Sequence, residues 1–141
     1  MPTVRHATPA DKQAVLEVWD TSGITQPWND PPRDFDRALA NASSAVIVVE
    51  DDNAEGAIHA ASIAGYDGHL GWIHMTGVRP GVQGRGIGRL LAQGAREFLR
   101  EQGASSACLM IAPGNDAGVA FWERVGFRRL DAPVWGTSLE A

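Results

Sequence analysis

A glycine-rich stretch near the middle of the 141-residue sequence has the composition of an anion-binding loop. Gly84, Gly86 and Gly88 lie between an apolar segment typical of a strand, residues 72–76, and residues with apolar side chains at helical spacing. Glycine has no Cβ, so the backbone can turn until several N–H groups point at one spot. The first turn of the following helix adds unpaired amides and the positive end of its dipole. The pattern therefore predicts a phosphate-binding loop at a strand–helix junction.

Two common phosphate-binding motifs do not fit this stretch. A Walker A loop requires Gly-Lys-Ser/Thr after its glycines, and that triplet does not follow Gly88. The dinucleotide-binding fingerprint has a different glycine spacing and requires a surrounding βαβ unit. A flexible turn with glycines that pack against the helix is the structural alternative.

The order of residues from Val78 to Leu91 resembles the acetyl-CoA pyrophosphate loop of the GNAT superfamily of N-acyltransferases. In this stretch Val78, Pro80 and Gln83 precede the three glycines. A second motif, from Asn115 to Phe127, is similar to the helix and strand that follow in that family. Residues 27–31 and 65–69 resemble segments of the bacterial YpeA-like acetyltransferases, so the similarity covers nearly the whole chain.

The resemblance implies transfer of an acetyl group from acetyl-CoA, as co-substrate, to a primary amine by direct attack on the thioester, without a metal. The pantetheine arm would lie between the strand ending at Val78 and the strand ending near Ala112, and the Val78 amide would donate to the developing oxyanion. The residues expected to bind the coenzyme are Gly77, Val78, Arg79, Gln83, Gly84, Arg85, Gly86, Ile87, Gly88, Arg89, Asn115 and Trp122.

Direct attack requires an amine that has lost its proton, because the pKa is about 10.4 for a lysine-like ammonium and about 8 for an α-amino group. His74 is the preferred base, since strand alternation predicts that it shares a face with Trp72 and Thr76. Asp67 and His69 are rival candidates. A structural role for a lone strand histidine is the alternative. Some relatives carry a glutamate base where this chain has Met110, which cannot serve.

Trp122 occupies the position where the family usually has a tyrosine that protonates the leaving thiolate. An indole donates a hydrogen bond but does not ionise usefully, so another proton source is needed. One hypothesis is that water protonates the thiolate. The other is that the chain is an acyl-CoA-binding or regulatory module with little turnover. Tyr66, the only tyrosine, is a substitute acid if it faces the thioester.

The acceptor pocket is expected at Trp28, Asn29 and Asp30, together with Asp67 and His69 of the predicted hairpin. The alternative for Trp28 is packing under its loop. The acceptor itself, a small molecule or a protein amino group, is not defined by these residues.

The elements that would position these residues alternate in a way that predicts one mixed α/β domain covering residues 1–141. The resemblance implies a GNAT-like, mostly antiparallel sheet whose middle strands splay apart. Strands are expected at residues 3–6, 45–49, 56–66, 71–78 and 106–112, with one or two more in 128–139. Helices are expected from Thr8 to near Gly23 and at residues 34–42, 86–102 and 115–125, with turns at 51–55 and at Asp67-Gly68.

The overall composition is that of a soluble globular protein, with 44% hydrophobic residues and a net charge of −5. The negative charge argues against non-specific nucleic-acid binding, and no run is long enough to cross a membrane. The single cysteine, Cys108, and an N-terminus without a signal-peptide pattern predict a cytoplasmic protein. The oligomeric state stays open, with a homodimer as one option.

Overall fold

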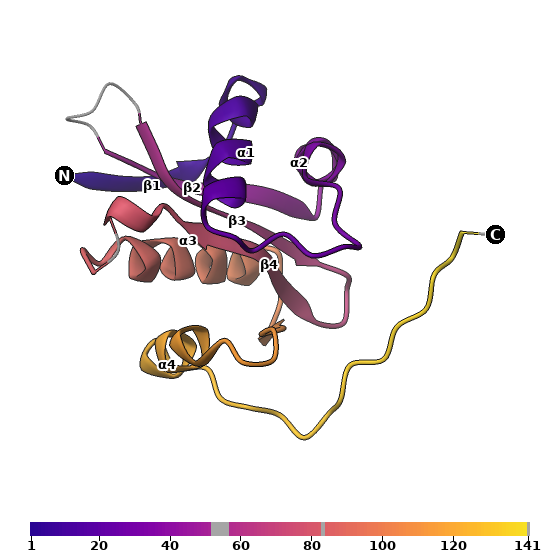
Figure 1. Ribbon diagram of the computed structural model, residues 1–141. Helices are drawn as coiled ribbons and strands as arrows, with labels where there is room; N and C mark the ends of the chain where they lie inside the picture. The colour runs from indigo at the N-terminus through magenta and orange to yellow at the C-terminus, as the bar shows by residue number, and fades with distance from the viewer. Residues whose placement is uncertain (52–56, 83, 141) are drawn as a thin grey trace. The chain divides into compact units, whose positions relative to one another are not determined.

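The computed structural model describes residues 1–51, 57–82 and 84–140, and the chain divides into two compact units, Met1–Met110 and Ile111–Ala141 (Figure 1). The predicted turn at 51–55 therefore falls almost wholly outside the described residues. The elements of the first unit are β1 (Pro2–His6), η1 (Pro9–Asp11), α1 (Lys12–Thr21), α2 (Pro31–Ala40), β2 (Ser44–Asp51), β3 (Ala57–Tyr66), β4 (Gly71–Val78), η3 (Pro80–Val82), α3 (Ile87–Glu101) and β5 (Ala107–Leu109).

The first unit is built on a five-stranded sheet in the order β1-β2-β3-β4-β5. Neighbouring strands are antiparallel except for β4 and β5, which are parallel. Helices α1 and α2 cover one face of the sheet, and α3 covers the other (Figure 1). The mixed, mostly antiparallel sheet predicted from the sequence is confirmed.

The core on the α1/α2 face forms because both helices carry apolar residues at helical spacing. Val15, Val18 and Trp19 of α1 are fully buried and pack with Phe35 of α2 and with β2 and β3. The β2 run 45–49 is buried throughout, as expected for a strand covered on both faces. On the other face α3 approaches so closely that a Cβ at Gly94 would meet Val4 and Ile47.

The alternation of β4 is broken by a bulge at Met75, which has a φ of 55° and lies where the register with β3 shifts. A Cβ at Gly71 would meet Leu99 of α3, whereas a Cβ at Gly77 would meet Ser22 and Trp19 of α1. Residues six apart on a regular strand share a face, so the opposite directions of Gly71 and Gly77 show that one residue has been inserted between them.

The predicted starts of the first two helices are correct to within a few residues. Thr8 and Asp11 form the expected capping box, although the first turn is the 3₁₀ helix η1 and not α-helix. Helix α2 begins at Pro31, before the predicted start at residue 34, because Asp30 accepts a hydrogen bond from the Arg33 amide and proline fits the first helical turn.

The second unit contains α4 (Asp116–Arg124), whose start is capped by Asn115. The strands expected in 128–139 are not formed: residues 128–140 are an extended segment without strand or helix (Figure 1). Val134 and Trp135 are 67% and 91% exposed there. Their apolar character indicated a strand, but a strand forms only where another strand pairs with its backbone, and Pro133 removes one amide donor.

Candidate functional site

The loop between β4 and α3 has the backbone shape that its glycines predict. Gly84 and Gly86 have φ of 84° and 78°, the left-handed region that favours glycine. Both are exposed and have open space around the Cβ position, whereas the flanking residues Val82 and Ile87 are buried, with 8% and 2% exposed. The loop is thus held at its two ends. Gln83, predicted to bind the coenzyme, lies outside the described residues.

The first turn of α3 presents unpaired amides beside this loop. Gly86 is the N-cap, and the Leu90 amide makes the first intrahelical bond, 3.1 Å from the Gly86 carbonyl. The amides of Ile87, Gly88 and Arg89 therefore have no acceptor within the helix. Arg85 and Arg89 are exposed, and the first turn carries no acidic residue. These amides, the dipole of a 15-residue helix and two guanidinium groups could hold a phosphate.

The end of β4 offers one backbone edge away from β3. The Arg79 amide donates to the His59 carbonyl at 2.8 Å, so this amide belongs to the β3 ladder. Backbone directions alternate along a strand, so the Val78 N–H points to the β5 side. The ladder between β4 and β5 ends at Ile73 and Leu109, and β4 continues to Val78. Strand β5 itself ends at Leu109, short of the strand end predicted near Ala112, so the splaying of the middle strands stays a prediction.

His74 faces the α1/α2 side of the sheet, where its ring stacks on Trp72 with centroids 5.7 Å apart and planes 5° from parallel. Burial lowers the pKa of His74 below the ordinary 6.5, and the carboxylate of Asp34 on α2 opposes this effect. The imidazole is accordingly neutral near pH 7 and able to accept a proton.

Thr76 does not share the face of His74, as strand alternation had predicted. The Met75 bulge turns Thr76 toward the α3 side, where its hydroxyl lies 2.8 Å from that of Ser62. Ser62 also donates to the His74 carbonyl at 3.1 Å. The bulge therefore fixes the His74 backbone while separating His74 from the hydroxyl predicted beside it.

The remaining acid and base candidates of the β3–β4 hairpin either lie on the other face of the sheet from His74 or belong to the turn. Tyr66 pairs with Gly71 and so shares the α3 face of the sheet, opposite His74. The Asp67 carboxylate accepts hydrogen bonds from the amides of His69 and Leu70, both at 2.7 Å, and these bonds lower its pKa. A carboxylate held in this way is a weak base. His69 is exposed.

The predicted acceptor residues 28–30 lie in the connection between α1 and α2. Trp28 is 74% exposed and does not pack under its loop. Asn29 accepts a hydrogen bond from the Gln26 amide at 2.8 Å, and Asp30 caps α2. The polar side chains thus stabilise the loop, and the indole of Trp28 is the group it offers to a ligand.

The two coenzyme-binding candidates of the second unit, Asn115 and Trp122, have clear local roles. Asn115 caps α4 by accepting from the Gly118 amide at 2.9 Å, as predicted for a helix start. The Trp122 ring lies between Phe121 and Phe127, with centroids 5.0 and 5.1 Å away and steep angles between the rings. Trp122 is thus part of the aromatic cluster of its unit.

Two residues beside the loop were not identified from the sequence, Asp51 at the end of β2 and His59 on β3. Asp51 Oδ2 lies 3.9 Å from Arg85 Nη2 and 3.8 Å from His59 Nε2. The only sequence signal is the interruption of an apolar strand by His59. That signal does not reveal which part of the chain His59 contacts.

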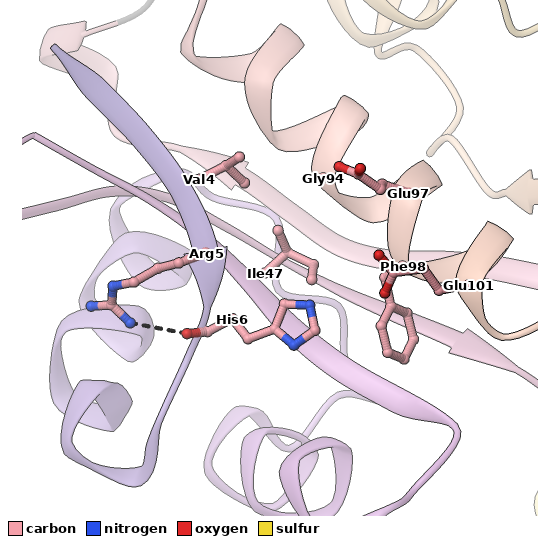
Figure 2. A pocket seen from close by; sticks show the side chains of 8 residues that line it. All are labelled: Val4, Arg5, His6, Ile47, Gly94, Glu97, Phe98 and Glu101. Atoms are coloured by element: carbon pink, nitrogen blue, oxygen red, sulfur yellow. Dashed lines mark hydrogen bonds between the residues drawn. The ribbon is translucent and has the colours of Figure 1, made fainter.

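A separate hollow of about 170 Å³ lies between β1 and the C-terminal half of α3 (Figure 2). The His6 ring packs edge-on against Phe98 at 5.5 Å, and Glu97 and Glu101 add carboxylates. Arg5 turns to the His6 carbonyl, to which it donates at 3.0 Å. The acidic lining does not suit a phosphate, and the hollow contains none of the predicted site residues.

Other kinds of site were sought within the described ranges 1–51, 57–82 and 84–140. These ranges hold no group of three or more His, Cys, Asp or Glu side chains arranged to bind a metal ion. None of the helices in this part of the chain is long and apolar enough to span a bilayer.

Comparison with known proteins was made at the level of family, sequence and fold. The model of the family described as "Acetyltransferase (GNAT) family" matches residues 13–127. A Pectobacterium atrosepticum protein named as an acetyltransferase is 32% identical over 129 residues, which cover 92% of this chain and 89% of that protein.

Two solved structures show the same fold. AAC(6')-Iy, in complex with the bisubstrate analogue CoA-S-monomethyl-acetylneamine, has a TM-score of 0.79 at 12% identity, covering 98% of each chain. Glucosamine-6-phosphate N-acetyltransferase from Arabidopsis thaliana has a TM-score of 0.75 at 15% identity, covering 99% of each chain. At these identities the likeness concerns the fold alone.

Proposed function

Because the chain belongs to the acetyltransferase (GNAT) family, we propose that it transfers the acetyl group of acetyl-CoA to a primary amine. The observation that carries this proposal is the loop between β4 and α3, with two left-handed glycines and three first-turn amides that have no intrahelical acceptor. The whole chain would act as one domain, since the family match spans both compact units.

The coenzyme would be held mainly by backbone groups. The amides of Gly84 to Gly88 and the first turn of α3 would bind its diphosphate, with Arg85 and Arg89 adding charge at the rim. The pantetheine arm would follow the edge of β4 that faces β5, beside Gly77 and Val78. Arg79 would support this edge indirectly, since its amide donates to the His59 carbonyl and its guanidinium to the Ile58 carbonyl.

The chemistry would start when His74, neutral at pH 7, takes a proton from the ammonium of the acceptor, directly or through water. The amine nitrogen then forms a bond to the thioester carbon. The carbon–sulfur bond breaks, its electron pair leaves with sulfur as the thiolate, and the nitrogen gives up a second proton to water as the amide forms. Because a thiol pKa is about 8.5, water can protonate this group without an acid at position 122. The Val78 peptide, directed to the β5 side, is the candidate oxyanion donor.

The acceptor amine would approach from the α1/α2 face, where His74 and Trp72 are stacked. Trp28 would offer an exposed aromatic surface in the α1–α2 connection, with Asn29 and Asp30 shaping that loop. Asp67 and His69 would lie at the hairpin end of the same strand. Solved structures with this fold include proteins named as an aminoglycoside antibiotic 6'-N-acetyltransferase and a glucosamine-6-phosphate N-acetyltransferase, so aminoglycosides and amino sugars belong in the first substrate panel.

The test is release of free thiol from acetyl-CoA in the presence of a panel of primary amines. Wild-type protein should release thiol above the buffer rate with at least one amine, and failure across a broad panel would refute the proposal. His74→Ala should lower kcat about 10²- to 10⁴-fold at pH 7, the range typical of general base catalysis. His6→Gln changes a histidine of β1 and should keep the wild-type rate.

The second candidate function is an acyl-CoA-binding module with little turnover. Two observations favour it: Trp122 is enclosed by phenylalanine rings where a tyrosine acid is expected, and Met110 replaces the glutamate base of some relatives. This candidate predicts that acetyl-CoA raises the melting temperature without thiol release. Under the enzyme proposal Trp122→Tyr should keep or raise the rate, so a large loss would contradict the assignment of that position.

A further inference from the structure

A buried histidine beside the loop lacks a hydrogen bond to any of the residues that the structure describes. His59 is only 8% exposed, and neither ring nitrogen makes a hydrogen bond. Buried polar atoms are normally paired, so an imidazole in this state calls for a physical explanation. His59 is the extra residue of a bulge in β3, because Val49 pairs with Ala60 and Glu50 pairs with Ile58. Bulges redirect side chains, and this one accompanies the burial of His59.

Arg79 holds the backbone of this bulge in place. The guanidinium of Arg79 donates from Nη2 to the Ile58 carbonyl at 3.0 Å, and the Arg79 amide donates to the His59 carbonyl at 2.8 Å. One residue at the end of β4 thus satisfies two successive carbonyls of β3. The direction of the His59 ring is therefore set by the same chain segment that leads into the loop.

The carboxylate of Asp51 lies between His59 and the loop. Its Oδ2 atom is 3.8 Å from His59 Nε2 on the buried side and 3.9 Å from Arg85 Nη2 on the solvent side. The Asp51 and His59 side chains are 14% and 11% exposed, whereas that of Arg85 is 56% exposed. A charge on the sheet thus faces the one arginine that stands between the two left-handed glycines.

The two left-handed glycines of the loop have open space at their Cβ positions. A Cβ at Gly84 or Gly86 would meet no atom within 4 Å, so neither backbone position packs against the body of the unit. The loop is held at the buried residues Val82 and Ile87, and Arg85, between the two glycines, is directed at an opposite charge on the sheet. An attraction at this point restricts the conformations of both glycines.

We propose that Asp51, backed by His59, is a positioning residue that holds the loop, through Arg85, in the shape in which its amides converge. The proposal rests on the proposed function, in which the loop binds the diphosphate of coenzyme A. His59 does not bind that phosphate itself, because an anion beside its Nε2 would face the Asp51 carboxylate. Both residues act through Arg85.

The test uses the full chain with Asp51→Asn and Arg85→Gln, singly and together. Coenzyme A binding is measured by calorimetry, and hydrogen exchange at the amides of Gly84 to Gly88 is measured in the unliganded protein. Asp51→Asn should weaken coenzyme A binding about fivefold, the scale of a partly exposed ion pair, and speed exchange in the loop. In the Arg85→Gln background the same change should add nothing, which a merely structural role of Asp51 would not produce.

Glu50→Gln is the matched control, since Glu50 precedes Asp51 on β2, points to the opposite face and pairs with Arg5. It should leave both loop exchange and coenzyme A affinity unchanged. If Asp51→Asn does not fold, Arg85→Gln removes the same pair from the exposed side, and His59→Gln tests its inner partner. His59→Gln should weaken coenzyme A binding less than Asp51→Asn does.

The outcomes separate the inference from the proposed function. In one outcome the wild-type protein binds coenzyme A while Asp51→Asn and Arg85→Gln change neither the affinity nor the hydrogen exchange of the loop. That result would overturn the inference and leave the proposed function standing. An equal additional loss from Asp51→Asn in the Arg85→Gln background would also overturn it. Faster loop exchange in Asp51→Asn without any wild-type coenzyme A binding would support the positioning role and refute the proposed function.

Discussion

Two neighbouring residues at the end of β2, Glu50 and Asp51, belong to two polar clusters with different geometry. Glu50, facing the η1/α1 side, and Asp11 both bind Arg5, through four hydrogen bonds of 2.8 to 3.1 Å. Asp51, facing the α3 side, lies 3.8 Å from the His59 imidazole and 3.9 Å from the Arg85 guanidinium. In the first cluster the Arg5 guanidinium is held by two carboxylates. In the second, the His59 ring nitrogens have no hydrogen bond.

The difference separates a group that stabilises the fold from a group that can respond to a ligand. The Arg5 cluster joins β1, η1 and β2, all within one rigid part of the sheet. Its bidentate geometry and short bonds leave little for a ligand to change. The Asp51 cluster joins the sheet to a loop with two left-handed glycines. The carboxylate of Asp51 and the guanidinium of Arg85 are far enough apart that they can still move closer. Unsatisfied polar groups in native proteins concentrate where function requires them.

The first prediction, which has the largest expected effect, concerns the cluster of Arg5 with Asp11 and Glu50. Arg5→Ala leaves the carboxylates of Asp11 and Glu50 close together without a cation, so the free energy of unfolding should fall by about 2 kcal/mol. Urea denaturation measures this loss. Coenzyme A affinity, measured by calorimetry on the folded variant, should stay at the wild-type value. A selective loss of affinity without loss of stability would erase the distinction between the two clusters.

Lys12→Ala is the control for this change. Lys12 also makes a 2.8 Å ion pair, with Asp36, but the two side chains are 36% and 60% exposed. Exposed pairs of this kind contribute about 0 to 1 kcal/mol, so the stability should change little. A loss as large as that of Arg5→Ala would show that chain-wide charge, and not the bidentate cluster, determines the first result.

The second prediction concerns the loop on the other side of the comparison. Gly86→Ala introduces no clash, since the Cβ position is open, but alanine at a φ of 78° costs about 1 kcal/mol. The loop should therefore change shape in part of the population, and coenzyme A binding should weaken about threefold to tenfold by calorimetry. Gly81→Ala is the control, because Gly81 also has open space but no positive φ. Equal effects at both glycines would contradict the role of the left-handed turn.

The loop itself could be predicted from the sequence because its cause is local. Glycines at 84 and 86 give left-handed backbone, the apolar spacing after them gives a helix, and the junction follows from their order. The caps at Thr8 and Asn115 and the turn at Asp67-Gly68 were predictable for the same reason. Each depends on residues no more than a few positions apart.

The environment of the loop could not be predicted, because it depends on contacts between distant residues. His59 reaches Asp51 through a bulge in β3, and Thr76 leaves the face of His74 through a bulge in β4. A bulge reverses the face of every later residue in a strand, and no residue type marks it reliably. The missing strands after Arg128 are a related case, since an apolar segment needs a pairing edge that its own sequence does not supply.

The third prediction uses pH to compare Asp11, in the Arg5 cluster, with Asp51. Hydrogen bonding to Arg5 lowers the pKa of Asp11 below its ordinary 3.8. An acid with a lowered pKa binds fewer protons when folded than when unfolded, so its stabilisation is present above pH 3.8 and is lost as the pH falls through the folded pKa. Acid titration of the unfolding free energy should show this loss below pH 3.8. Arg5→Ala should remove much of it, whereas Asp51→Asn should retain it.

The smallest expected effect is the titration of His74, which tests whether a group outside both clusters behaves independently of them. Burial lowers the pKa of His74 below 6.5, so the unfolded chain binds more protons than the folded chain as the pH falls below 6.5. The stability conferred by neutral His74 is therefore complete above pH 6.5 and declines toward the folded pKa. His74→Gln should flatten the pH dependence of the unfolding free energy below pH 6.5, measured by urea denaturation, and Asp51→Asn should leave that slope unchanged. A slope that persists in His74→Gln would show that His74 is not the group responsible for it.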